Sequence, residues 1–163
     1  MKRMLGIVLL LPIFLLIGIT TYKDISFKID CGGHIKRAAD ANTVELAIQE
    51  METVTTYLER EGMTSGYASI LYRTPDEDVG FWYANLKSSL NELKKVRPET
   101  SQLERSNLLL KLRETLLDRG GQGDEKITAP HGISRYPNNV GFALLGILSL
   151  VLIIPGMICL FLE

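Results

Sequence analysis

The sequence predicts an all-α membrane protein in which two transmembrane helices flank a small antiparallel helical bundle. An almost unbroken apolar run fills residues 4–19, and a second fills Val140–Leu162. Between them, residues 23–139 hold 16 of the 18 Lys and Arg residues and 18 of the 19 Asp and Glu residues, a formal net charge of about −2. This balance lacks the basic excess of nucleic-acid-binding proteins, so we expect no nucleic-acid partner.

Residues 1–22 have the features of a transmembrane signal anchor. Lys2 and Arg3 precede the apolar run, as basic residues do in cleaved signal peptides too. A helix over residues 4–22 is about 28 Å long, close to the thickness of a hydrocarbon core. The residues that follow lack the small-residue cleavage site of a signal peptide. We therefore expect an uncleaved anchor, with a cleaved signal peptide as the alternative.

The orientation follows from domain length more than from charge. Lys2 and Arg3 favour a cytoplasmic N-terminus. The other flank carries as many basic residues: Lys23, Lys28, Lys36 and Arg37. Long domains cross the membrane largely regardless of charge. We expect an extracytoplasmic domain and cytoplasmic termini in the cell or plasma membrane, with the reverse orientation as the alternative.

Residues 23–37 are predicted to connect the anchor to the bundle without a helix. Ile25, Phe27 and Ile29 alternate as in a short strand, and they would equally suit chain that lies on the membrane surface. The sequence Cys31-Gly-Gly-His34 should break any regular element.

Capping signals and apolar periodicity predict the first helix of the bundle. Asn42 and Glu45 form a capping box, with Asp40 as a rival start, and Gly62 marks the end. The apolar residues that share one helical face are Val44, Ala47, Ile48, Met51, Val54 and Leu58. Residues 63–73 fit neither period well, and we favour a short helix there over an extended crossing.

The second and third helices carry similar start signals. Thr74 is the expected N-cap of the second, with Pro75 at its first position and Glu77 completing the box. Its apolar stripe comprises Val79, Trp82, Tyr83, Leu86, Leu90 and Leu93. Ser101 and Glu104 form the capping box of the third, which continues through Asp118. Its apolar face comprises Leu103, Leu109, Leu110, Leu112, Leu116 and Leu117.

Three helices joined by short links predict an antiparallel bundle within an extramembrane domain over residues 23–120. Because successive helices alternate in direction, the third should end far from the membrane. Residues 121–139 are then an extended linker, long enough to return the chain to a C-terminal transmembrane helix over residues 140–163.

No catalytic, cofactor or metal site is predicted. Cys31 and His34 are too few for a zinc site, and the acidic residues Asp76 and Asp78 lack the later oxygen ligands of a calcium loop. There is no Gly-x-Ser-x-Gly elbow, P-loop, His-Glu-x-x-His or dinucleotide motif. The apolar runs contain no Asp, Glu, Lys, Arg or His before Glu163, which argues against an ion pathway.

Two interaction features remain. The aromatic triplet Phe81-Trp82-Tyr83 places Trp82 and Tyr83 on the core stripe and Phe81 elsewhere, so it is a candidate contact for a partner or the membrane. In an oxidising compartment, Cys31 of two chains could form an intermolecular disulfide and a homo-oligomer.

These features favour a non-catalytic membrane protein, embedded in the lipid bilayer, that acts as an accessory, scaffold or assembly subunit. Its partners would be other membrane or envelope proteins. The alternative is a sensory input module, in which a helical domain between two transmembrane helices senses a ligand and signals through a separate partner.

Overall fold

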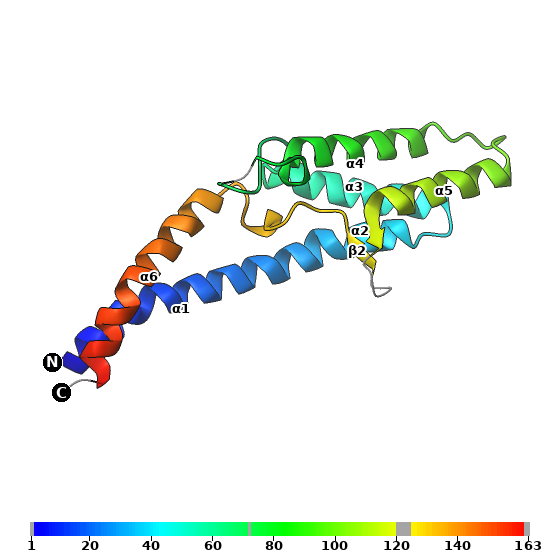
Figure 1. The fold of residues 1–163 in the computed structure, drawn as a ribbon. Helices are drawn as coiled ribbons and strands as arrows, with labels where there is room; N and C mark the ends of the chain where they lie inside the picture. Colours follow the sequence, from blue (N-terminus) through cyan, green and yellow to red (C-terminus); the bar gives the residue numbers. More distant parts are fainter. Residues whose placement is uncertain (1, 72, 120–124, 162–163) are drawn as a thin grey trace.

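A computed structural model describes residues 2–71, 73–119 and 125–161. The chain is mostly helical, so the all-α class is confirmed. Helices α1 (Lys2–Phe27) and α6 (Asn139–Phe161) form a hairpin at one end of the molecule, and a helical domain forms the other end (Figure 1). The two ends of the chain lie together at the tip of this hairpin (Figure 1).

The first helix does not stop at the end of its apolar run. α1 continues through a π-helical segment, η1 (Lys28–Gly32), into α2 (Gly33–Ala39). Together they make one helix of 38 residues, about 57 Å long. The Gly33 N–H donates to the Lys28 carbonyl, so one extra residue is accommodated without a break.

The predicted strand or irregular connector over residues 23–37 is therefore wrong. The glycine pair Gly32-Gly33 keeps right-handed helical backbone angles, although glycine is a poor helix former. Packing against the rest of the domain compensates, because Cys31 and Gly32 are both buried.

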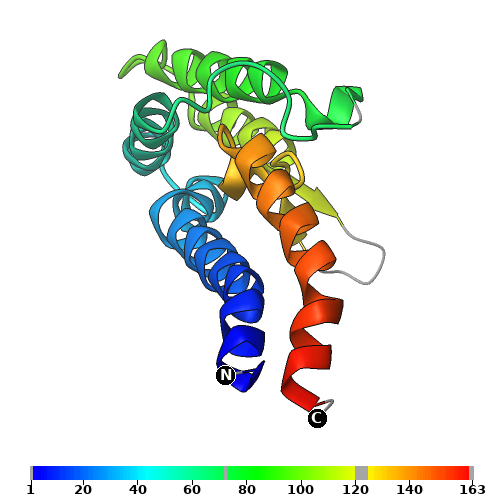
Figure 2. The ribbon, with the colours of Figure 1, turned by 90° about the vertical axis from the view of Figure 1, so that its left-hand side faces the viewer.

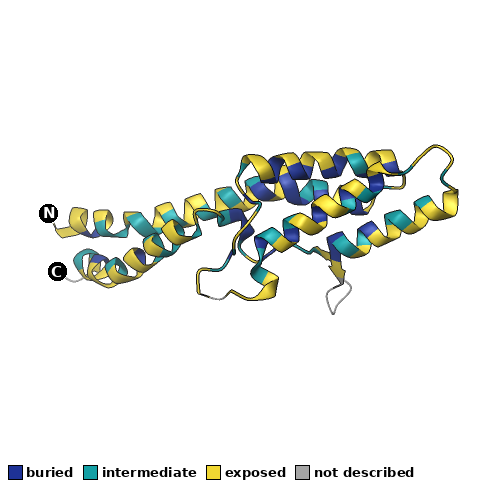
Figure 3. Cartoon of the chain, turned by 90° about the horizontal axis from the view of Figure 1, so that it is seen from above, coloured by how far each residue is buried: buried dark blue, intermediate teal, exposed yellow. Residues whose placement is uncertain are grey.

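α1 and α6 are long and apolar enough to cross a membrane, as predicted. They run side by side (Figure 2), and most of their residues are exposed or only partly buried (Figure 3). Only 6% of the most apolar window of the first helix is buried, and only 11% of that of α6. The core helix of a soluble protein would be mostly buried.

The hairpin helices approach each other closely at two glycines. A Cβ on Gly6 would lie 2.9 Å from the carbonyl oxygen of Gly156. A Cβ on Gly156 would lie 2.9 Å from the Leu10 Cδ2 atom. Small residues of this kind allow two membrane helices to pack backbone against backbone.

The domain is a bundle of four helices rather than three. α2 and α4 (Val79–Lys94) each pack against both α3 (Val44–Arg60) and α5 (Gln102–Leu116). The fully buried side chains at its centre include Ile35, Met51, Leu58, Leu86, Leu93 and Leu116. The four helices alternate in direction. α2 leads away from the hairpin, α3 returns toward it, α4 leads away and α5 returns (Figure 1).

Side-chain caps begin α5 and α3, and a glycine follows the end of α3. Ser101 accepts from the Glu104 N–H (3.2 Å), as predicted. Thr43 accepts from the Leu46 N–H (3.3 Å), so the expected caps Asn42 and Asp40 are wrong. Gly62, with a φ of 71°, does follow the end of α3, and the next N–H reaches back to the Leu58 carbonyl.

The start of α4 also differs from the prediction. Pro75–Glu77 is a separate 3₁₀ turn, η2, and Thr74 makes no capping bond. Asp78 accepts from the Phe81 N–H (2.9 Å) and caps α4 instead.

Residues 63–71 and 73 form a loop, so the favoured short helix is wrong. Gly66 has a φ of 91°, which no helix allows. The loop is tied to η2 and α4 by backbone bonds from Ala68 to Glu77 and from Val79 to Gly66, both 2.9 Å.

The expected extended linker is also wrong. β1 (Leu117–Arg119) pairs antiparallel with β2 (Glu125–Ile127), and η3 (Ile133–Arg135) follows. Ile133 and Ser134 are buried, and the Ser134 hydroxyl donates to Asp24 of α1. No long return is needed, because α5 already points back toward the hairpin (Figure 1). Residues 120–124 lie outside the described part of the chain.

Gly6→Val should weaken the α1–α6 hairpin, because its side chain would meet the Gly156 backbone, which cannot move aside. Overpacking of this kind costs about 1–3 kcal/mol, so we expect the Tm of the full chain in mild detergent to fall by several degrees. Gly18→Val is the matched control on the same helix, since a Cβ there has nothing within 4 Å. Equal Tm values for both variants would contradict the packing.

Asp78→Ala should lower the free energy of unfolding by about 1 kcal/mol through loss of the α4 cap. Thr74→Ala, the control, should change it by less than about 0.5 kcal/mol. Denaturant titration followed by circular dichroism distinguishes the two. A larger loss of stability in Thr74→Ala than in Asp78→Ala would instead support Thr74 as the cap, as predicted from the sequence.

Candidate functional site

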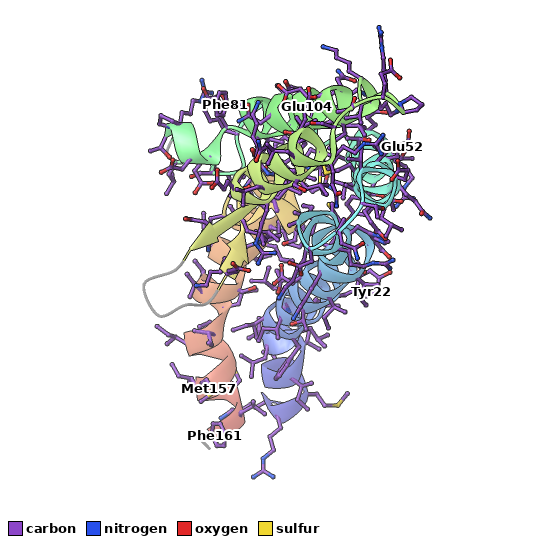
Figure 4. All side chains as sticks on the ribbon, turned by 90° about the vertical axis from the view of Figure 1, so that its right-hand side faces the viewer. Tyr22, Glu52, Phe81, Glu104, Met157 and Phe161 are labelled. Carbon is purple, nitrogen blue, oxygen red and sulfur yellow. The ribbon has the colours of Figure 1, made fainter. Side chains whose placement is uncertain are left out.

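The aromatic triplet is divided among three environments. Trp82 is 6% exposed and belongs to the core. Tyr83 is partly buried, and its hydroxyl donates to Glu59 of α3, which also pairs with Lys87. Phe81 is 64% exposed and points away from the bundle (Figure 4). Within the triplet, Phe81 is thus the side chain most accessible to a partner.

Phe81 lies at the edge of a groove between α4 and the β1–β2 hairpin. The groove has a volume of about 450 Å³. Phe81, Trp82 and Pro130 give it apolar surface, while Asp118 and Lys126 place charges of both signs beside them. This combination suits an amphipathic protein segment better than a small apolar ligand.

Cys31 is buried in the core of the domain. Its side chain has no exposed surface, and burial together with the nearby charge of Asp30 raises the pKa of the thiol to about 12. The thiolate is the reactive form of cysteine. In the folded domain the sulfur is enclosed, so the possible intermolecular disulfide of Cys31 would require the domain to open.

A buried carboxylate, Glu50 of α3, was not predicted. It is 6% exposed and accepts from Nδ1 of His34 and from the guanidinium of Arg37, both at 2.5 Å. The residues of this cluster come from α2 and α3, so the cluster ties the first helix to the bundle. The sequence does not predict this cluster, because His34 and Arg37 lie in a segment that is expected to be irregular.

The Glu50 cluster joins one carboxylate to two basic side chains. Within residues 2–71, 73–119 and 125–161, no three His, Cys, Asp or Glu side chains are grouped to hold a metal ion. The groove beside the cluster is open and lined largely by surface residues of α3, among them Gln49, Thr53 and Arg60.

A large cavity lies where α1 and α6 diverge beneath the domain. Its volume is about 700 Å³. Leu16 and Ile17 of α1 line it, with Phe142 and Gly146 of α6 opposite. The loop at Ala68–Ile70 and the segment around η3 close the end nearest the domain.

Polar groups gather at that end of the cavity. Oε2 of Glu77 is buried and has no hydrogen-bond partner among the described residues. Asp24 accepts from Ser134, and Asn139 donates to the carbonyls of Tyr67 and Ala68. His131 and Arg135 complete the polar lining. Four separate stretches of sequence contribute, so no local motif could have revealed this site.

The Cys31 thiol should resist alkylation in the folded protein. In a Cys159→Ser variant, which leaves Cys31 as the sole thiol, maleimide labelling in mild detergent should be at least tenfold slower than in denaturant. A Cys31→Ser variant reports the reactivity of Cys159 separately. Rapid labelling of native Cys31, or a Cys31-dependent dimer on non-reducing electrophoresis, would contradict the buried position.

Comparison of the chain with protein-family models, with curated proteins and with solved structures finds no match.

Proposed function

We propose that this protein is a non-catalytic integral membrane protein whose helical domain acts as an accessory, scaffold or assembly subunit. The α1–α6 hairpin would anchor the domain at the extracytoplasmic face, and the domain would bind other membrane or envelope proteins. The observation that carries this proposal is the single helix from Lys2 to Ala39, apolar and exposed in its first half and part of the domain core in its second.

The exposed surface of the hairpin supports a membrane setting. Apolar side chains cover both helices on their outward faces, among them Phe14 of α1 and Leu150 of α6. In water such a surface would be costly, and patches of this extent mark membrane or protein contacts. If the hairpin crosses a bilayer, both chain ends lie on one side and the domain on the other (Figure 2).

The surface around Phe81 supports a protein partner. An exposed phenylalanine beside a groove with mixed charges has the composition of an interface centre with a polar rim. The other polar clusters on the bundle, such as Glu59–Lys87 and Glu92–Lys111, are ion pairs between neighbouring helices. They support the bundle and leave the Phe81 groove as the best candidate for binding.

A sensory input module is the second candidate, and one observation favours it. The 700 Å³ cavity touches α1, α6 and the domain at once, so a ligand there would contact both proposed membrane helices. A signal would have to pass to a separate output partner. Ligand-dependent thermal shifts of the full chain would favour this function, and a flat response across a metabolite library would count against it.

Phe81→Glu should abolish partner binding if the groove is the interface. We expect recovery of the partner in affinity purification from native membranes in mild detergent to fall at least tenfold, because a buried charge would replace an apolar anchor. The control is Leu103→Glu on α5, where the leucine is 73% exposed and lies outside the groove.

Both variants should keep the Tm of the wild-type chain. Recovery of the wild-type protein as a monomer without partners would count heavily against the scaffold function. Equal loss of binding in both variants would indicate that the interface is not specific to the Phe81 groove.

A further inference from the structure

We propose that the cavity between α1 and α6 binds a phospholipid whose zwitterionic headgroup carries a primary ammonium group, as phosphatidylethanolamine does. The acyl chain would lie between the two helices, and the headgroup would lie under the domain. This inference rests on the proposed membrane location and goes beyond the proposed scaffold function.

The polarity of the cavity changes along its length. One end is lined by Leu16 and Ile17 of α1 and by Phe142 and Gly146 of α6. The other end carries charged groups, including Asp24 on the same helix as Leu16. A ligand that fills the cavity must therefore be apolar at one end and charged at the other.

The change occurs at the depth expected for a membrane interface. Leu16 lies within the first apolar run, whereas Asp24 lies about 12 Å further along α1, beyond the end of the run. On α6, Asn139 begins the helix and Gly146 lies about 10 Å deeper. The two helices thus place the polar end of the cavity at the same level, where lipid headgroups lie.

The acidic groups specify the positive part of the headgroup. A buried carboxylate oxygen without a partner is costly, and Oε2 of Glu77 has no hydrogen-bond partner among the residues that the structure describes. Asp24 is a second carboxylate on the cavity wall. A primary ammonium group offers three N–H donors and a positive charge to these oxygens. A choline headgroup has the charge but no N–H donor, and a glycerol headgroup has neither an ammonium group nor a positive charge.

Arg135 specifies the negative part. It lines the same cavity, and none of the ion pairs between described residues includes its guanidinium. Arginine binds phosphate through paired N–H donors. A phosphate next to an ammonium group matches Arg135 on one wall and Glu77 on another. The volume of about 700 Å³ holds a headgroup and the first part of a chain.

The test measures lipid retained by the full chain. Protein purified in mild detergent is incubated with equal amounts of phosphatidylethanolamine, phosphatidylcholine and phosphatidylglycerol, and bound lipid is counted by native mass spectrometry. We expect at least tenfold more phosphatidylethanolamine than either other lipid. Glu77→Gln should reduce that preference at least fivefold.

Gly146→Leu gives an independent readout from the apolar end. A Cβ at Gly146 would lie 3.8 Å from Leu16 Cδ2, an ordinary contact, and Gly146 lines the cavity, so a larger side chain there should occupy part of it. We expect it to reduce retained phosphatidylethanolamine at least fivefold. Gly141→Leu is the matched control on the same helix, because a Cβ there has nothing within 4 Å and the residue does not line the cavity. It should retain lipid as the wild type does.

Equal retention of the three lipids would overturn the proposal, as would retention unchanged by both Glu77→Gln and Gly146→Leu. Alkaline carbonate extraction of the same chains separates the two hypotheses. Release of the wild-type chain from membranes refutes the proposed membrane function. A chain that stays in the membrane but shows no preference for phosphatidylethanolamine refutes the lipid site alone.

Discussion

One unbroken helix, Lys2–Ala39, is the constraint on which the rest of the structure depends. Its first half pairs with α6 through the Gly6–Gly156 approach, and its second half is a core element of the domain. A helix resists bending because its backbone bonds are satisfied along its own axis, so the hairpin and the bundle cannot rotate freely about a hinge. The buried Glu50, held by His34 and Arg37, fixes the neighbouring helix to this axis.

The same helix decides how the chain returns to the hairpin. With α2 as the first element of the bundle, four helices alternate in direction, and α5 ends on the side facing α6 (Figure 1). The segment before α6 is then free to fold. It forms the β1–β2 pair and η3, and the Ser134–Asp24 bond joins it to α1. This bond lies beside the large cavity, so the closure of the chain and the cavity wall share residues.

The buried polar groups of the described residues differ in their surroundings. Cys31 is a core residue, and burial raises the pKa of its thiol. The buried carboxylate of Glu50 is paired with His34 and Arg37. Glu77 differs from both, because its buried Oε2 atom has no hydrogen-bond partner in the described part of the chain and Glu77 lines a cavity. Polar groups left in this state near an apolar wall are typical of ligand sites. The lipid site is therefore proposed at the cavity and not at the Glu50 cluster.

The sequence by itself determined the helical class, the two long apolar helices, the Ser101 cap, the stop at Gly62 and the burial of Trp82, because each depends on neighbours a few residues apart. Only the tertiary structure decided the rest. Packing held Gly32-Gly33 in a helix, despite the low helix propensity of glycine, and buried Cys31. The Glu50 cluster and the cavity around Glu77 join residues that are distant in the sequence. Periodicity reports the face on which a residue lies, but only the packing of the helices reports what lies opposite it.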